Sequence, residues 1–217
     1  MAGYLTRELD LAFGGQSYRI QALKDLQQFD DPDDVAERAG ISSAQWSLFG
    51  QPWPSGRVLA EHMAGFDVAG KRALELGCGL ALASLVLARR GVDVTASDYH
   101  PLAGEFLRAN CRANDLPEIP FVQLDWAKPE PGPGRFDLLI GSDILYERWH
   151  AELLAGAIER HAEARAEVVV TDPGRGNSNR FVRALKAQGF EVEERRMAFE
   201  AGQDPPYRGR LITARRG

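Results

Sequence analysis

Short apolar segments alternate with longer amphipathic segments from Arg72 onward, and this alternation constrains the fold more than any other feature. The apolar runs have the length of strands, and the segments between them have the length and spacing of helices. Strands that alternate with helices predict a parallel sheet with helices on both faces. The expected strands lie at residues 73–76, 92–97, 121–124, 136–141 and 168–171, and the expected helices at 81–90, 101–114, 149–164 and 179–188.

The C-terminal part of the chain has a different pattern. Residues 190–198 and 210–215 are two expected strands with no helical segment between them, joined by the sequence DPPYRG at 204–209. A parallel crossover usually needs a helix and a dozen or more residues, so this pair must be antiparallel. The pattern therefore predicts an α/β fold, a Rossmann-like, doubly wound, seven-stranded and mostly parallel sheet that ends in an antiparallel hairpin.

The N-terminal part is less regular. Residues 17–23 show strand-like alternation, and the acidic turn at 30–34 could start a short helix. A loop rich in glycine and proline at 49–56 leads into an amphipathic helix at 57–63. We therefore expect one main domain over residues 46–217, preceded by an N-terminal elaboration over residues 1–45 that could recognise a substrate.

Composition excludes several classes of function. The net charge of −5 and pI of about 5.5 give no basic footprint for nucleic acid. The two cysteines lie far apart and the four histidines lack ligand spacing, so we expect no metal site. No apolar run approaches the ~20 residues that span a bilayer, and the N-terminus lacks the apolar core of a signal peptide. By default we expect a cytoplasmic protein with no membrane partner.

Glycines and an acidic residue follow the first two strands of the main domain. Gly77, Cys78 and Gly79 come directly before a helix, where glycines let the backbone approach a ligand closely. Asp98 ends the next strand, 21 residues beyond Gly77, where a carboxylate could accept both hydroxyls of a ribose. A tight turn would ordinarily explain the glycines, and a helix cap would ordinarily explain Asp98. The evidence for a ligand site therefore comes from the spacing between them.

Polar and aromatic residues also follow the third and fourth strands. Asp125 and Trp126 could hold an adenine through a carboxylate–amine hydrogen bond and an aromatic contact, although a core position would explain Trp126 equally well. Ser142 and Asp143 end the fourth strand. Ligands of open α/β sheets bind at the carboxyl ends of the strands, so these residues form one candidate cofactor site.

A glycine turn followed by an acidic residue serves both nicotinamide dinucleotides and S-adenosylmethionine. The full dinucleotide fingerprint would place a third glycine at position 82, where this chain has Leu82. Glu75, two residues before Gly77, suits a cationic cofactor with a free amino group and repels a pyrophosphate. These two positions favour S-adenosylmethionine.

The chain resembles the class I, seven-β-strand, S-adenosylmethionine-dependent methyltransferases. Residues 72–90, RALELGCGLALASLVLARR, resemble their motif I. Other segments resemble the protein-lysine methyltransferase branch that acts on the electron-transfer-flavoprotein β-subunit, calmodulin and chaperones: QPWPSG at 51–56, SDYHP at 97–101, DW at 125–126, GSDILYE at 141–147 and TDPGR at 171–175. The resemblance covers about residues 46–217.

The resemblance implies a role for individual residues. It places the methionine part of the cofactor on Glu75 and the glycine turn, the ribose on Asp98 and the adenine on Asp125 with Trp126. Asp143 and Tyr146 would face the methyl group and the acceptor. The implied cofactor-binding residues are Trp53, Glu75, Gly77, Cys78, Gly79, Asp98, Tyr99, Asp125, Trp126 and Ser142.

Three functions stay open at this point. The branch motifs favour N-methylation of a lysine side chain of a protein, and the same cofactor half would serve a small-molecule amine. No NPPY-type motif follows the fourth strand, which weakens amide and adenine acceptors. A third alternative is an inactive cofactor-binding partner, but acidic residues at four strand ends argue against it, namely Glu75, Asp98, Asp125 and Asp143.

Overall fold

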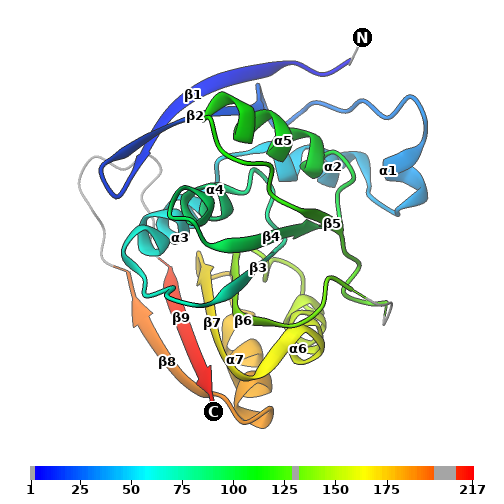
Figure 1. Ribbon diagram of the computed structural model, residues 1–217. Coiled ribbons are helices and arrows are strands. Elements are labelled where there is room, and N and C mark those ends of the chain that lie inside the picture. Colours follow the sequence, from blue (N-terminus) through cyan, green and yellow to red (C-terminus); the bar gives the residue numbers. More distant parts are fainter. Residues whose placement is uncertain (1–2, 129–131, 198–208) are drawn as a thin grey trace.

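A computed structural model describes residues 3–128, 132–197 and 209–217 (Figure 1). Within this part, seven strands form one sheet in the order β5-β4-β3-β6-β7-β9-β8. The strands are β3 (Arg72–Leu76), β4 (Asp93–Asp98), β5 (Phe121–Gln123), β6 (Phe136–Ser142), β7 (Ala162–Asp172), β8 (Glu191–Arg196) and β9 (Arg210–Arg216). Neighbours from β5 to β7 are parallel, and β9 is antiparallel to both β7 and β8. The predicted fold class is confirmed.

Helices cover both faces of this sheet (Figure 1). Apolar residues of α3, α4 and α5 pack on one face with Leu138 and Val169, and those of α6 and α7 pack on the other with Leu139 and Val168. Successive strand residues point to opposite faces, so continuous apolar runs are what a doubly covered sheet requires. The helices are α3 (Pro54–Gly65), α4 (Leu82–Arg89), α5 (Ala103–Ala113), α6 (His150–His161) and α7 (Ser178–Ala187).

Several sequence-based boundaries differ from the structure, most clearly at the start of β7. The helix expected to reach residue 164 ends at His161, and Ala162 already belongs to β7, where it pairs with Phe136. Alanine and glutamate favour helices by propensity, and the strand pairing overrides that preference. The expected strand at 190–198 corresponds to β8 over Glu191–Arg196. Residue 198 and most of the expected connection at 204–209 lie outside the described residues.

The N-terminal part forms a two-stranded antiparallel sheet of β1 (Thr6–Phe13) and β2 (Gln16–Leu23), followed by α1 (Val35–Arg38), α2 (Ser43–Trp46) and the 3-10 helix η1 (Ser47–Gly50). The alternation at 17–23 predicted β2, whereas β1 was missed. The acidic turn does start a helix, because the Asp31 carboxylate accepts hydrogen bonds from the backbone N–H groups of Ala36 and Glu37 at 3.0 and 2.8 Å.

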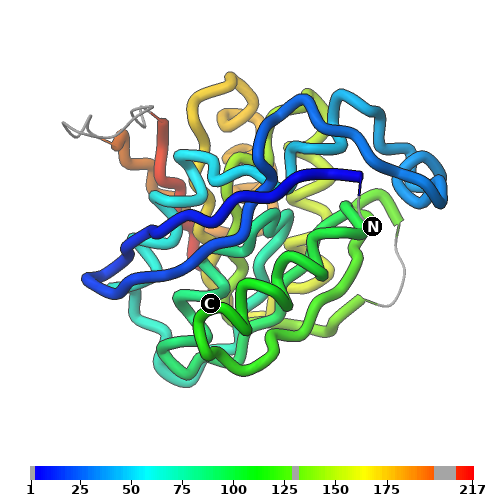
Figure 2. Tube along the Cα trace, turned by 90° about the horizontal axis from the view of Figure 1, so that it is seen from above, coloured from blue at the N-terminus to red at the C-terminus, as the bar shows by residue number. Residues whose placement is uncertain are grey.

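Two asparagines, one on α5 and one at its C-terminal end, attach the hairpin to this helix. The Asn114 amide accepts a hydrogen bond from the Arg19 N–H at 2.9 Å and donates one to the Arg19 carbonyl at 2.7 Å, and Asn110 accepts the Gln21 N–H at 2.7 Å. The hairpin accordingly runs beside α5 (Figure 2). Its apolar residues, including Ile20, belong to the same core as α4 and α5. The functional division at residue 45 stays a prediction.

The described residues hold neither a membrane-spanning helix nor a metal-binding cluster. In the ranges 3–128, 132–197 and 209–217, no helix has the length and apolar character needed to cross a membrane. The same part of the chain holds no cluster of three or more histidine, cysteine, aspartate or glutamate residues that could bind a metal ion.

Candidate cofactor and acceptor site

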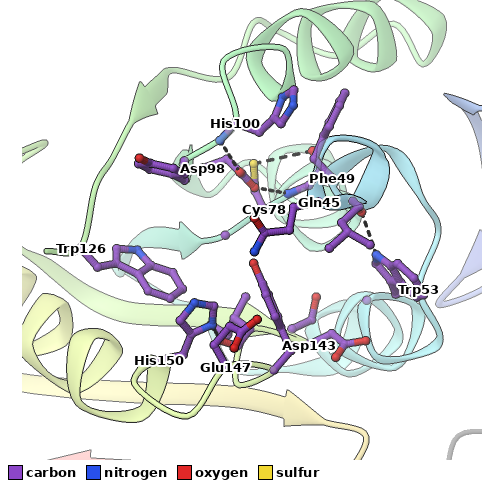
Figure 3. A pocket seen from close by; sticks show the side chains of 18 of the residues that line it. Gln45, Phe49, Trp53, Cys78, Asp98, His100, Trp126, Asp143, Glu147 and His150 are labelled. Carbon is purple, nitrogen blue, oxygen red and sulfur yellow. Dashed lines mark hydrogen bonds between the residues drawn. The ribbon is translucent and has the colours of Figure 1, made fainter. Parts of the chain in front are cut away.

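A cavity of about 570 Å³ lies at the carboxyl ends of the parallel strands (Figure 3). It opens beside β3, which pairs with β4 on one side and β6 on the other, so the direction of winding reverses here. Such a switch point is where open α/β sheets bind their ligands. The structure brings all the sequence-predicted site residues to this cavity: Trp53, Glu75, Gly77, Cys78, Gly79, Asp98, Tyr99, Asp125, Trp126, Ser142, Asp143 and Tyr146.

The glycine turn after β3 has no room for side chains at its two glycines. Gly77 and Gly79 have φ values of +64° and +53°, the left-handed region that glycine adopts without strain. A Cβ atom on Gly79 would lie 2.8 Å from the Phe49 carbonyl oxygen, and one on Gly77 would lie 2.7 Å from Ile144. Between them, burial raises the pKa of the Cys78 thiol well above its ordinary value, so this residue stays a thiol. The turn therefore presents mainly backbone to the cavity.

Asp98 ties the glycine turn to the end of β4. One carboxylate oxygen accepts the Gly79 N–H and the other accepts the His100 N–H, both at 2.8 Å. Burial raises the pKa of Asp98, and these backbone donors oppose that effect. A carboxylate has about four lone-pair sites, so the two oxygens can still accept a pair of hydroxyl groups. That capacity matches the two hydroxyls of a ribose.

Glu75 is a buried carboxyl on β3 that also lines the cavity. Its Oε2 atom accepts hydrogen bonds from the backbone N–H and the hydroxyl of Ser84, at 2.9 and 2.5 Å. Burial raises the pKa of Glu75 to about 7, with a smaller contribution from Asp98. A cation in the cavity would stabilise the ionised form of this group. Glu75 therefore fits a cofactor that carries an ammonium and a sulfonium group.

Asp125 and Trp126 form the cavity wall beyond β5. The Asp125 carboxylate accepts the Ala127 N–H at 2.9 Å and lies 3.5 Å from the Lys128 ammonium. The half-buried Trp126 indole points toward the cavity and lies edge-on to His150, with ring centroids 5.9 Å apart (Figure 3). A flat apolar surface beside a carboxylate suits an aminopurine.

Asp143 and Tyr146 lie in the loop after β6. Asp143 caps no helix, because α6 begins only at His150. Its carboxylate forms an ion pair with Arg175, with 3.0 Å between Nε and Oδ1. Although 42% of Tyr146 is accessible, partial burial and the nearby carboxylates raise its pKa to about 12, so its hydroxyl keeps its proton at neutral pH. This end of the cavity thus offers a carboxylate and a phenol to a second ligand.

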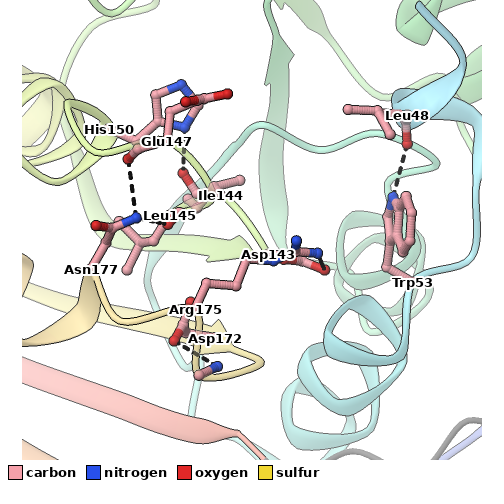
Figure 4. A network of polar contacts seen from close by, with 11 residues as sticks. Leu48, Trp53, Asp143, Ile144, Leu145, Glu147, His150, Asp172, Arg175 and Asn177 are labelled. Atoms are coloured by element: carbon pink, nitrogen blue, oxygen red, sulfur yellow. Dashed lines mark hydrogen bonds and ion pairs between the residues drawn. The ribbon is translucent and has the colours of Figure 1, made fainter. Parts of the chain in front are cut away.

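Part of the cavity wall was not predicted from the sequence. Trp53, which was predicted, precedes α3 and donates its indole N–H to the Leu48 carbonyl at 2.8 Å (Figure 4). Nearby, Phe49 stacks on His100 with ring centroids 4.0 Å apart, and burial lowers the pKa of His100 to about 4. The missed lining residues include Gly40, Ile41, Gln45, Leu48, Phe49, His100, His150 and Arg175.

The mostly parallel sheet with its terminal antiparallel pair, together with a glycine turn at the switch point, defines the class I methyltransferase fold. Solved structures with this fold include a methyltransferase from Pyrococcus furiosus, with a TM-score of 0.61 and 17% identity, covering 77% of this chain and 88% of that one. Magnesium protoporphyrin IX methyltransferase from Synechocystis, solved with bound SAM, gives 0.56 and 22%, covering 74% and 76%.

A family model described as lysine methyltransferase matches residues 42–188, and the chain therefore belongs to the lysine methyltransferase family. Protein N-lysine methyltransferase METTL21A of Danio rerio is 30% identical over 191 residues, 81% of this chain and 85% of the relative. Electron transfer flavoprotein beta subunit lysine methyltransferase of Xenopus laevis is 31% identical over 134 residues, 60% of this chain. That match spans about half of the relative, 52% of its length. Family membership confirms S-adenosylmethionine as the cofactor.

The glycine turn predicts a specific loss of cofactor binding. Gly79→Ala should weaken the affinity for S-adenosylmethionine by about tenfold or more, because the new Cβ must displace the Phe49 carbonyl and the turn with it. Gly91→Ala is the matched control: its φ is +75°, and nothing lies within 4 Å of its Cβ. Both variants carry backbone strain of about 1–2 kcal/mol. Calorimetric titration should find native affinity in the control, and equal affinities in the two variants would contradict this role of the turn.

The raised pKa of Glu75 predicts that the stability of the ligand-free protein depends on pH. The pKa of Glu75 in the folded state is raised to about 7 from an ordinary value of 4.5. Protonated Glu75 therefore contributes fully to the stability of the folded state below pH 4.5, and this contribution is lost as the pH rises through about 7. The full effect is on the order of 3 kcal/mol. Glu75→Gln cannot titrate, so the difference in unfolding free energy between native and variant proteins should shift by that order between pH 4.5 and 8. Urea unfolding measures it, and a constant difference would refute the assignment.

Proposed function

We propose that this chain transfers a methyl group from S-adenosylmethionine to the side-chain amine of a lysine in another protein. The observation that carries the proposal is the pair of Asp143 and Tyr146 at the end of a cavity whose other walls suit the cofactor. The names of the Danio rerio and Xenopus laevis relatives, both lysine methyltransferases acting on proteins, support the same acceptor.

The proposed placement of the cofactor follows the chemistry of the cavity. Glu75 and the glycine turn would hold the methionine part, Asp98 the ribose, and Asp125 with Trp126 the adenine. Each partner matches a property of the site, since Glu75 favours a cation and Asp98 keeps free acceptor capacity. Trp53, Cys78, Tyr99 and Ser142 complete the wall.

The acceptor end would position an amine. When bound, S-adenosylmethionine supplies a methyl group on a sulfonium sulfur, and its transfer leaves a neutral thioether and puts the positive charge on the acceptor nitrogen. A lysine has an ordinary pKa of ~10.4, so its nitrogen must first lose a proton to have a free lone pair. Asp143 would orient the amine through a hydrogen bond, and Tyr146 would shape the channel beside it. Positioning of this kind accounts for a large share of the rate in bimolecular reactions.

Exposure at the cavity rim favours a protein acceptor over a small amine. Three aromatic residues that line the cavity are exposed, with 40% of Tyr99, 42% of Tyr146 and 59% of Trp149 accessible. A closed pocket for a small molecule would bury such side chains, whereas an open rim lets a lysine enter from a folded surface. A small-molecule amine is the second candidate. A cytoplasmic location and the absence of nucleic-acid and membrane partners stay predictions.

Label transfer separates these functions. The chain is incubated with S-adenosylmethionine carrying a labelled methyl group and with a lysate of the organism that carries the gene. The proposal expects label in one or a few protein bands, with mass spectrometry locating it on a lysine Nζ atom. Label confined to small molecules would support the second candidate, and no transfer at all would contradict both.

Asp143 is expected to act in transfer and not in cofactor binding. Asp143→Asn should lower the rate of label transfer by roughly a hundredfold or more, because the amine loses the carboxylate that orients it through a hydrogen bond. Affinity for S-adenosylmethionine should stay within about twofold of native. Asp93→Asn is the control, since Asp93 is an exposed carboxylate at the amino end of β4. Rates come from scintillation counting, and full activity in Asp143→Asn would remove this residue from the site.

A further inference from the structure

The loop after β7 contributes a guanidinium group to the acceptor end of the cavity. Arg175 Nε donates to Asp143 Oδ1 at 3.0 Å, and a second contact joins Nη2 to Oδ2 at 3.5 Å (Figure 4). The Asp143 side chain is only 8% exposed, while that of Arg175 is 47% exposed. Both residues line the cavity. The carboxylate that faces an incoming amine is thus paired with a fixed positive charge.

The position of Arg175 does not depend on this ion pair alone. In the same loop, the Asn177 amide donates hydrogen bonds to the carbonyls of Leu145 and Glu147, at 2.7 and 3.3 Å (Figure 4). On the other side, the Asp143 N–H donates to the Thr171 carbonyl at 2.9 Å. These bonds join the loop after β7 to the loop after β6, and they hold both partners of the pair at the cavity.

Other charged groups face the pair from the surrounding elements. Burial raises the pKa of Asp172, with Asp143 adding to this effect and Arg175 and Arg210 opposing it. Tyr146 has a raised pKa through burial and through the nearby carboxylates, and Arg175 opposes that shift as well. The ion pair that the described residues show for Arg175 is with Asp143. Arg175 is therefore placed to change the charge that an amine beside Asp143 would meet.

We propose that Arg175 is a positioning residue that neutralises Asp143, so that the acceptor end of the cavity selects a neutral amine over an ammonium ion. This inference rests on the proposed function. A carboxylate without Arg175 would attract an ammonium ion and raise the pKa of the acceptor. With Arg175 in place, the charges of the pair largely cancel, so an ammonium ion gains little from Asp143 and lies near a second cation that disfavours its charged form.

A neutral amine loses nothing from the presence of Arg175. It can donate an N–H hydrogen bond to Asp143 and still keep its lone pair free for the methyl carbon. The proton leaves to solvent before the amine is bound, so neither Asp143 nor Tyr146 has to act as a base. An ordinary surface ion pair would have no such effect, because solvent would screen it. This one includes a carboxylate that is nearly buried.

Binding of n-butylamine, a mimic of the lysine side chain, tests the inference. Ligand-observed NMR measures the affinity of the full chain for total amine between pH 7.5 and 9.5, with S-adenosylhomocysteine present. If only the neutral form binds, affinity rises about tenfold per pH unit, because the pH stays below an amine pKa of ~10.4. We expect that slope in the native chain and in Arg175→Lys. In Arg175→Gln the ammonium form binds Asp143, so affinity should change less than about threefold.

Arg180→Gln is the matched control. Arg180 is another arginine that follows β7, and it pairs with the exposed Glu152 and with the Arg148 carbonyl instead of Asp143. Its removal should leave the native slope. A flat profile in the native chain, or the same slope in native and Arg175→Gln proteins, overturns the inference, as does a failure of every variant to bind the amine. Label transfer to protein lysines is measured separately, so the proposed function can stand when this inference fails.

Discussion

The hydrogen bond that Asp98 accepts from Gly79 connects the two loops on which the whole site depends, and the bond from His100 fixes Asp98 within its own loop. The Gly79 bond joins the turn after β3 to the end of β4, at the point where the sheet reverses its direction of winding. The turn can adopt this path only because Gly77 and Gly79 accept left-handed backbone angles and carry no Cβ. Phe49 then packs over the turn from the N-terminal side and stacks on His100, so the N-terminal part forms one wall of the cavity.

The carboxylates at the two ends of the cavity differ in whether a positive charge lies beside them. At the proposed cofactor end, Glu75 is buried without a cationic partner among the contacts that the structure describes, and burial holds its pKa at about 7. A cationic cofactor would supply the missing positive charge. At the acceptor end, Arg175 already balances Asp143. The proposed reaction binds a cationic cofactor and transfers its methyl group to a neutral nitrogen. This difference suits it, because Glu75 attracts a positive charge and the paired Asp143 does not.

Local patterns predicted most of the sheet and the residues at its edge, since strand ends and glycine turns are encoded within a few positions. The continuous apolar run Val168–Val170 marks a strand covered on both faces, and Asp98 could be placed from its spacing to Gly77. The predictions failed where contacts between residues distant in the sequence determine the local structure. Residues 162–164 become a strand because Ala162 pairs with Phe136. The largely exposed β1 pairs along its length with β2, and β2 is in turn bound to Asn114 through Arg19. The stacking of Phe49 on His100 joins residues far apart in sequence, and no motif signals it.

A crystal structure of the chain with S-adenosylhomocysteine tests the central claim most directly. We predict that the ribose hydroxyls bind Asp98, that the adenine lies against Trp126, and that the amino group of the amino-acid part lies near Glu75. The sulfur should then face the Asp143 and Tyr146 end of the cavity, where the acceptor enters. The cavity lies at the carboxyl ends of β3 and β4. A ligand bound outside this cavity, or bound inside it with the adenine at Asp143, would contradict the proposed arrangement of cofactor and acceptor.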